Sequence, residues 1–229
     1  MRPASPASIW VVVTAYNESS VISEVVKGIR QGGYSVVVVD DASSDDTGDR
    51  ALSAGARVLR HPINLGQGAA LQTGIAFALR NEAQYIVTFD GDGQHRPEDI
   101  ASLTDALMQH QADFALGSRF LGNALDLPRL RRAILRLAVL FTRLTTGLKV
   151  TDAHNGLRAM TRRGASYIRL RQNRMAHASE ILDQIARSKL AYVEVPVTIV
   201  YTAYSLQKGQ RISNSVSILI DLLTRRLHR

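Results

Sequence analysis

The chain has 229 residues, of which 45% are hydrophobic, so its length and apolar content suit a single α/β domain with a sizeable core. It contains no cysteine, which excludes disulfides and thiolate metal sites. Its formal net charge is +8, but aromatic residues make up only 6% of the chain and no nucleic-acid-binding motif occurs, so no nucleic-acid partner is expected.

The amino-terminal region leads into a first strand with a polar end. Residues 1–8 lack the apolar core of a signal peptide, and we expect a flexible segment there. The apolar run of residues 9–13 predicts a strand, and the sequence TAYNE follows it at residues 14–18. This turn is neither the G-x-G-x-x-G loop of a dehydrogenase nor the glycine-rich, lysine-bearing loop of a sugar nucleotidyltransferase, so both classes are disfavoured.

A helix and a second strand come next, and the second strand also ends in polar residues. Apolar side chains at helical spacing between Ile22 and Ile29 predict the helix, which the two glycines at residues 32–33 close. Residues 36–39 (VVVV) predict the strand, and the acidic sequence DDASSDDT follows at residues 40–47. Two strands with polar ends are therefore expected to meet at one edge of a sheet.

Two carboxylates follow a later apolar run. Residues 85–89 (YIVTF) predict a strand, and Asp90 and Asp92 come directly after it in the sequence DGDGQH. A hard cation such as Mg²⁺ or Mn²⁺ binds carboxylate oxygens and keeps open positions for phosphate oxygens. An isolated Asp-Gly-Asp is also compatible with a plain acidic turn, but here a glycine-rich segment at residues 64–70 (NLGQGAA) and the two earlier polar ends accompany it. The pattern predicts a divalent metal site.

The alternation of strand-like and helical segments predicts an α/β fold with a Rossmann-like, mostly parallel sheet and helices on both faces. Ligands of such open sheets bind at the carboxyl ends of the strands. Pro97 is expected at the first position of a helix whose inner side carries Ile100, Leu103 and Leu107. Residues 113–117 are expected to form the next strand.

The later part of the chain combines basic and apolar residues. Between Arg129 and Leu144, arginines and leucines form a basic amphipathic helix, which is typical of a membrane-surface helix or of a core-packed helix with a solvated basic face. Residues 193–201 alternate as a half-buried strand does, and Pro196 indicates an edge position or a bulge. A second basic cluster follows the apolar residues 218–223, and no apolar run approaches the ~20 residues of a transmembrane helix. We therefore expect peripheral contact with an anionic membrane surface.

Four motifs occur in order along the chain: Y-N-E, D-D-x-S-x-D-x-T, N-x-G-x-G-A and D-x-D-x-Q-H, with Gly-Ser-Arg at residues 117–119. Together they resemble the family 2 glycosyltransferases of the GT-A fold over roughly residues 9–215, with dolichyl- and polyprenyl-phosphate sugar synthases as the most similar subgroup. The resemblance implies one domain over residues 1–229, with a nucleotide-binding half at about 9–118 and an acceptor half at about 119–229. It also implies a UDP- or GDP-sugar donor and a Mg²⁺ or Mn²⁺ cofactor. Because nothing directs export, we expect a cytoplasmic enzyme at the cytoplasmic face of the membrane.

The resemblance also implies roles for individual residues. Asp90, Asp92 and Gln94 are implied as metal ligands, with His95 behind them. The implied contacts to the nucleotide-sugar are Ala15, Tyr16, Glu18, Asp40, Asp41, Gly68 and Asp90. We expect an inverting single displacement, in which the metal neutralises the departing nucleoside diphosphate.

A lipid-phosphate acceptor is already anionic at neutral pH, so it needs cations more than it needs a base. Related enzymes carry such cations at the positions of Arg119, Arg131 and Arg211. The sequence departs from the lipid-phosphate enzymes at Gln210-Arg211, where they often have Ser-Lys, and at Thr14, where many relatives have proline.

Two alternatives involve a different acceptor or no reaction. A sugar or lipid hydroxyl acceptor would require a general base, for which Asp152 and Glu180 are the candidates, although each is equally compatible with a structural carboxylate. A non-catalytic sugar-nucleotide-binding protein is a third hypothesis, and the intact motifs argue against it.

Overall fold

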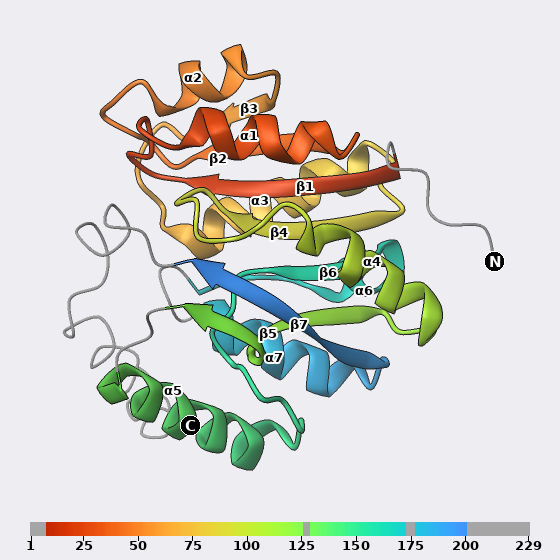
Figure 1. Ribbon diagram of the computed structural model, residues 1–229. Helices are drawn as coiled ribbons and strands as arrows, with labels where there is room; N and C mark the ends of the chain where they lie inside the picture. Colours follow the sequence, from red (N-terminus) through yellow and green to blue (C-terminus); the bar gives the residue numbers. More distant parts are fainter. Residues whose placement is uncertain (1–7, 126–128, 173–176, 201–229) are drawn as a thin grey trace.

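A computed structural model describes residues 8–125, 129–172 and 177–200, which form one seven-stranded sheet between two layers of helices (Figure 1). The strand order is β3-β2-β1-β4-β6-β5-β7, and only β6 runs antiparallel to its neighbours. The strands are β1 (Ile9–Ala15), β2 (Ser35–Asp40), β3 (Arg57–Arg60), β4 (Tyr85–Asp90), β5 (Phe114–Leu125), β6 (Arg158–Thr161) and β7 (Tyr192–Val200). The predicted mostly parallel sheet is confirmed.

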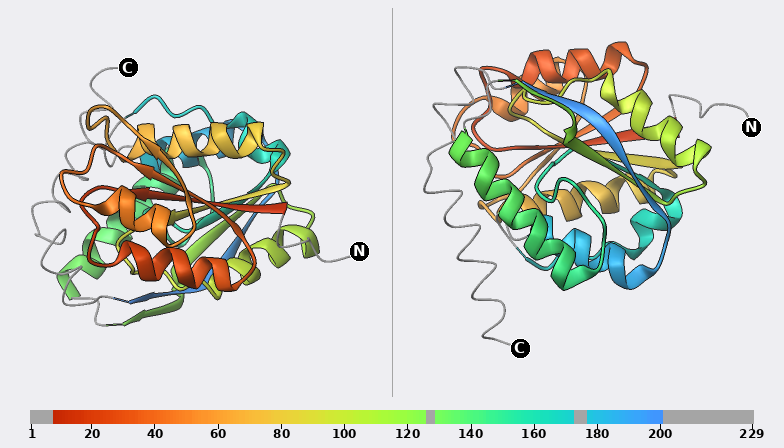
Figure 2. Two further views of the ribbon diagram at one scale, coloured as in Figure 1. Left: turned by 90° about the horizontal axis from the view of Figure 1, so that it is seen from above. Right: turned by 60° about the horizontal axis from the view of Figure 1, so that its bottom comes forward.

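Helices cover both faces of the sheet, as the two views in Figure 2 show. They are α1 (Ile22–Gln31), α2 (Thr47–Ser53), α3 (Gln67–Arg80), α4 (Asp99–Gln109), α5 (Arg129–Thr146), α6 (Arg162–Tyr167) and α7 (His177–Ser188). One apolar core lies between the sheet and α1, α2 and α4, and the other lies between the sheet and α3, α5, α6 and α7.

The central strands are apolar throughout because they are covered on both sides. In β1, Val11 and Val13 face the α1 and α4 side, whereas Trp10 and Val12 face the α3 side, and all four are buried. A strand buried on both faces reads as a continuous apolar run, which is why the sequence signal of β1, β2 and β4 was strong. These buried strands fix the positions of the polar residues at their carboxyl ends.

Several elements differ in extent from the prediction. Helix α4 begins at Asp99, two residues after the expected start at Pro97, and β5 continues from the expected end at Gly117 to Leu125. Strand β7 lies at the edge of the sheet, and Pro196 pairs with Ser118 where the β5–β7 register becomes irregular, which confirms the interpretation of this proline. Strands β3 and β6 were not predicted.

The two expected halves of the chain interleave in the sheet. Their expected boundary, near residue 118, falls inside β5, and β6 from the later half lies between β4 and β5. Within the described ranges, no helix combines the length and the apolar character needed to cross a membrane. The expected flexible residues 1–7 and the basic cluster after residue 223 lie outside these ranges.

Candidate functional site

The predicted polar strand ends meet at the carboxyl edge of the sheet. Thr14 at the end of β1 is the register partner of Asp90 in β4, and Ala15 is the partner of Asp40 in β2. The tip of β1 is joined to the acidic segment by hydrogen bonds from the Asn17 amide to Ser43 Oγ (2.9 Å) and from the Glu18 amide to Thr47 Oγ1 (2.7 Å). Three sequence motifs therefore form one surface.

Asp90 is held from several directions. Gln67 Nε2 donates to Asp90 Oδ1 at 2.8 Å, and His95 Nε2 lies 3.1 Å from Oδ2. A Cβ atom on residue 156 would lie 2.2 Å from Oδ2, which is too close, so this position requires glycine. Burial opposes ionisation of Asp90, but the hydrogen bond and charge of His95 outweigh it and lower the pKa of this carboxyl.

The pKa of Asp92 is shifted in the opposite direction to that of Asp90. Burial and the neighbouring charge of Asp90 raise the pKa of Asp92 to about 6. The Gln94 amide donates to Asp92 Oδ1 at 3.0 Å, across a turn in which Gly93 has φ +75°. The paired carboxylates repel each other, and a divalent cation between them would relieve that repulsion. The repulsion between the two carboxylates therefore fits a bound cation. Among the residues that the structure describes, no group of three or more histidine, cysteine or acidic side chains could hold a metal ion.

The loop that carries Asp90 and Asp92 is tied to β7. The Val200 amide donates to the Gln94 carbonyl at 2.9 Å, and His95 forms an isolated β-bridge with Ile199. The ring of His95 also packs edge-on against Phe89, with centroids 5.3 Å apart. The carboxyl end of the last described strand thus supports the carboxylate pair.

The two adjacent aspartates after β2 have different surroundings. Asp41 accepts hydrogen bonds from the amides of Leu65 (2.9 Å) and Gly66 (2.7 Å) and lies 2.7 Å from His61 Nδ1. Both of its carboxylate oxygens therefore hold the loop that starts α3. Asp40 accepts a hydrogen bond from the Ser43 amide at 2.9 Å.

A pocket of about 320 Å³ opens beside Asp40. Its lining residues are Asp40, Ala42, Ser43, Asp45, Asp49, Arg60, His61 and Pro62. Tyr16 lies at the tip of β1 with 47% of its surface exposed. Gly68 is required by packing, because a Cβ atom there would lie 2.0 Å from the Gln172 carbonyl oxygen.

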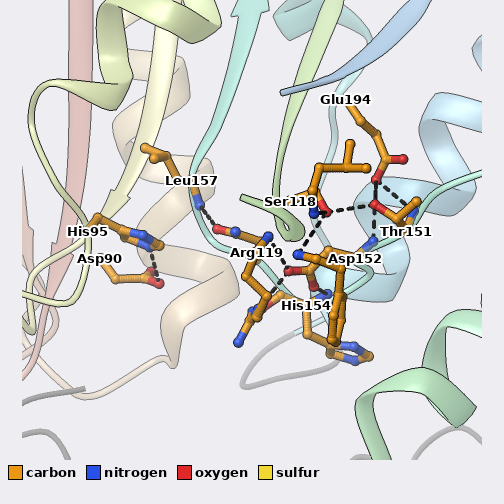
Figure 3. A network of polar contacts seen from close by, with 12 residues as sticks. Asp90, His95, Ser118, Arg119, Thr151, Asp152, His154, Leu157 and Glu194 are labelled. Carbon is orange, nitrogen blue, oxygen red and sulfur yellow. Dashed lines mark hydrogen bonds and ion pairs between the residues drawn. The ribbon is translucent and has the colours of Figure 1, made fainter. Parts of the chain in front are cut away.

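Arg119 and Asp152, which were predicted in separate roles, are partners in a buried ion pair (Figure 3). Arg119 Nε donates to Asp152 Oδ2 at 2.6 Å, and Arg119 Nη2 donates to the His154 carbonyl at 3.0 Å. The side chains are only 7% and 1% exposed. The Asp152 amide donates to Glu194 Oε1 in β7 at 3.3 Å, and the Thr151 hydroxyl donates to the same oxygen at 3.0 Å. The Asp152 carboxylate is thus held in place by the Arg119 guanidinium and by the His154 amide, which donates to Oδ1 at 3.2 Å.

The other candidates for the acceptor side have different positions. Glu180 in α7 accepts hydrogen bonds from the amides of Arg171 and Gln172, so it fixes the backbone before that helix. Arg131 belongs to α5, but its side chain is not among those described, and Arg211 lies outside the described residues.

Of the residues that act on Asp90, His95 was expected from the sequence, but Gln67, Arg158 and His177 were not. Gln67 lies in the glycine-rich motif at residues 64–70, but no role was predicted for it. No role was predicted for Arg158 either. Arg158 and His177 act on Asp90 through their charge and lower its pKa. Only Gln67 could have been found from the sequence, because it lies in a recognised motif. Arg158 and His177 come near Asp90 only when the chain is folded.

Similarity to known proteins extends over most of the chain. The sequence profile described as Glycosyl transferase family 2 matches residues 10–169. The chain is 30% identical to the UDP-N-acetylglucosamine--dolichyl-phosphate N-acetylglucosaminyltransferase of Methanococcus voltae, over 94% of each chain. It is also 30% identical to the undecaprenyl-phosphate mannosyltransferase of Micrococcus luteus, over 84% of this chain and 83% of that protein.

The fold is also found in solved structures. The glucosyl-3-phosphoglycerate synthase of Mycobacterium tuberculosis, crystallised with Mn²⁺, UDP and glucosyl-3-phosphoglycerate, superposes with a TM-score of 0.73. It is 21% identical in sequence, and the match covers 95% of this chain and 79% of that chain. The predicted GT-A arrangement of the sheet is confirmed.

Proposed function

The chain belongs to glycosyl transferase family 2, and from this premise we propose that it moves a sugar from a nucleotide-sugar to a polyprenyl or dolichyl phosphate. Two relatives that are 30% identical are named for transfer to dolichyl and undecaprenyl phosphate. The observation that carries the proposal is the carboxylate pair of Asp90 and Asp92 at the carboxyl edge of the sheet, close to the pocket beside Asp40. This is the place where an open α/β sheet binds its ligand.

The donor side is proposed to centre on Asp90, Asp92 and Gln94, as ligands of Mg²⁺ or Mn²⁺. A bound divalent cation would neutralise the charge that develops on the leaving nucleoside diphosphate. Burial and the charge of Asp90 together raise the pKa of Asp92, which supports this assignment, because a cation would stabilise the ionised pair. His95 and Gln67 hold the Asp90 carboxylate in a fixed orientation.

The nucleoside is proposed to bind between the tip of β1 and the pocket beside Asp40. Tyr16 and Glu18 at that tip, with Ala15 below them, are the proposed contacts together with Asp40. Asp41 is proposed to act indirectly, because its oxygens hold the amides before α3. Gly68 has a similar indirect role, since it allows α3 to approach the chain at residue 172.

The acceptor side is proposed to use cations. A phosphate oxygen of the lipid attacks the anomeric carbon, the bond from that carbon to the nucleoside diphosphate breaks, and the configuration inverts. Arg119 is the proposed cation for the acceptor phosphate, with Asp152 orienting its guanidinium. Arg131 and Arg211 are proposed as further acceptor cations. A phosphate acceptor needs no general base, which is consistent with an Asp152 that is already bound to an arginine.

Helix α5 is proposed to bring the enzyme to the membrane that carries the lipid. Its inner side is buried through Leu135, Ala138, Val139 and Thr142. Its outer side exposes Leu137 (56%), Leu140 (53%) and Leu144 (78%), beside the exposed Arg132, Arg136 and Arg143. A purely solvated face would not carry three leucines, whereas an interfacial helix combines apolar insertion with cations that face anionic lipids. We propose a peripheral position on that surface.

The reaction is tested by mass spectrometry of the products. The protein is incubated with Mn²⁺ or Mg²⁺, a panel of UDP- and GDP-sugars, and a short polyprenyl phosphate in detergent. The expected product is a glycosyl phosphoryl lipid, formed with inversion at the anomeric carbon as read by NMR. The matched control is Asp92→Ala, which is expected to form none. Free nucleotide and sugar without a lipid product would overturn the phosphate acceptor.

A further inference from the structure

Arg158 is a buried arginine whose charge acts on Asp90. It is the first residue of β6, and its register partners are Thr88 in β4 and Leu116 in β5. Because side chains alternate along a strand, Arg158 shares a face with Met160, which belongs to the core under α3 and α7. Asp90 shares that face with Ile86 for the same reason. Arg158 therefore lies on the same side of the sheet as Asp90.

The charge of Arg158 is compensated by carboxylates at a distance. The residue is only 4% exposed, and within the described part of the chain its Nη1 atom is buried without a hydrogen-bond partner. Arg119, by contrast, is hydrogen-bonded to Asp152. Burial lowers the pKa of Arg158 to about 10, and the charges of Asp90 and Asp152 act in the opposite direction. Arg158 is therefore a buried cation at neutral pH, whose charge interacts with Asp90 on the donor side and with Asp152 on the acceptor side.

We propose that Arg158 is a positioning residue shared by Asp90 and Asp152, whose charge weakens the binding of a divalent cation to the carboxylate pair, so that tight binding requires the added negative charge of a diphosphate. This inference rests on the proposed function, because it takes Asp90 as a metal ligand. With Arg158 in place, the carboxylate pair carries less net negative charge, and a cation gains full affinity only when a diphosphate adds its own charge. Metal without donor then binds weakly.

The test measures Mn²⁺ affinity by electron paramagnetic resonance of the free ion, at neutral pH, with and without UDP or GDP. Arg158→Met is expected to bind Mn²⁺ alone roughly threefold or more tightly than the wild type, because a like charge is removed. The Arg158→Met variant should also bind Mn²⁺ more tightly than the wild type when UDP or GDP is present, because the same like charge is absent from that complex. Arg158→Lys keeps the charge and should stay near the wild type.

The matched control is Arg80→Met, which removes an exposed arginine at the far end of α3 and should change nothing. An Arg158→Met protein that is folded by circular dichroism and binds Mn²⁺ no more tightly than the wild type would overturn the proposal. A purely structural role predicts a lower melting temperature with unchanged or weaker metal binding. The sign of the change in affinity therefore separates the two roles.

A second measurement does not depend on metal. In EDTA, the melting temperatures of Asp90→Asn, Arg158→Met and the double variant form a cycle that isolates their interaction. The double variant should melt higher than the sum of the single shifts, and if Arg158→Met alone fails to fold, the double variant should recover folded protein. Additive shifts, or no recovery, would overturn the proposal. If the wild type bound no Mn²⁺ while the cycle showed coupling, the metal assignment would fail and the charge interaction between Arg158 and Asp90 would stand.

Discussion

At the scale of single residues, Asp92 determines how the metal-free site responds to pH. Its pKa is about 6 in the folded protein against a usual value of 3.8. The folded state therefore binds the extra proton more readily, and the stabilisation from this proton is complete below pH 3.8 and lost as the pH rises through 6. Above pH 6 the ionised pair destabilises the metal-free protein by roughly 1–3 kcal/mol.

Asp92→Asn should remove this penalty. In EDTA at pH 7.5, the variant is expected to melt at a higher temperature than the wild type, and the difference should vanish toward pH 5, where Asp92 is protonated in the folded wild type. Added Mn²⁺ should raise the melting temperature of the wild type but not that of the Asp92→Asn variant. Differential scanning fluorimetry across this pH range measures both effects.

The control for this prediction is Asp105→Asn, which neutralises an exposed carboxylate of α4. It should keep the response to Mn²⁺ and show no gain in melting temperature that grows with pH. A metal-free Asp92→Asn protein that is less stable than the wild type at pH 7.5 would contradict the like-charge account of this pair.

At the scale of elements, α5 is expected to control membrane binding through its exposed leucines. Leu140→Glu combined with Leu144→Glu should reduce binding to vesicles that contain anionic phosphatidylglycerol by tenfold or more, because each change replaces an inserting side chain by a charge that the surface repels, at roughly 1 kcal/mol or more per site. Vesicle sedimentation measures the bound fraction. Activity on a detergent-dispersed acceptor should change much less.

The control for α5 is Leu52→Glu, since Leu52 is 59% exposed but belongs to α2, at the opposite end of the sheet (Figure 1). It adds the same charge without touching the proposed surface. Vesicle binding that falls equally in this variant would mean that net charge alone governs association. Binding that survives the double change in α5 would remove this helix as the membrane contact.

Whether an element could be predicted depended on how completely it is covered. The sequence predicted β1, β2 and β4 because both of their faces are buried and nearly every residue is apolar. Strands β3 and β6 have four residues each, and both begin with an arginine, so no periodic pattern distinguishes them from loops. The exposed leucines of α5 could not be separated from buried ones, because the inner side of that helix is apolar as well.

At the scale of the whole molecule, the interleaved sheet should unfold as one unit. Strand β6 joins β4 to β5, and β5 itself crosses the expected boundary near residue 118, so the two halves share one sheet. Urea unfolding followed by the fluorescence of Trp10, the single tryptophan, should coincide with unfolding followed by circular dichroism. Separate midpoints would show that the nucleotide half folds independently.

The same interleaving limited what could be predicted about the site. The donor-side motifs were recognisable because each follows its own strand, and parallel strands bring their ends to one edge. The pairing of Arg119 with Asp152 joins residues that are 33 positions apart, and Gln67 reaches Asp90 across 23 positions. Such contacts depend on the strand order, and short-range sequence patterns contain no information about that order.

The contact between β7 and the loop after β4 has a consequence for the time that the site spends assembled. Because the Gln94 carbonyl accepts from the Val200 amide and His95 bridges to Ile199, that loop opens only when the end of an edge strand also detaches. Edge strands are among the first parts of a sheet to open locally. The carboxylate pair should therefore lose its geometry whenever the end of β7 opens. The rate of hydrogen exchange at the Val200 amide would then measure how often the metal site is disassembled.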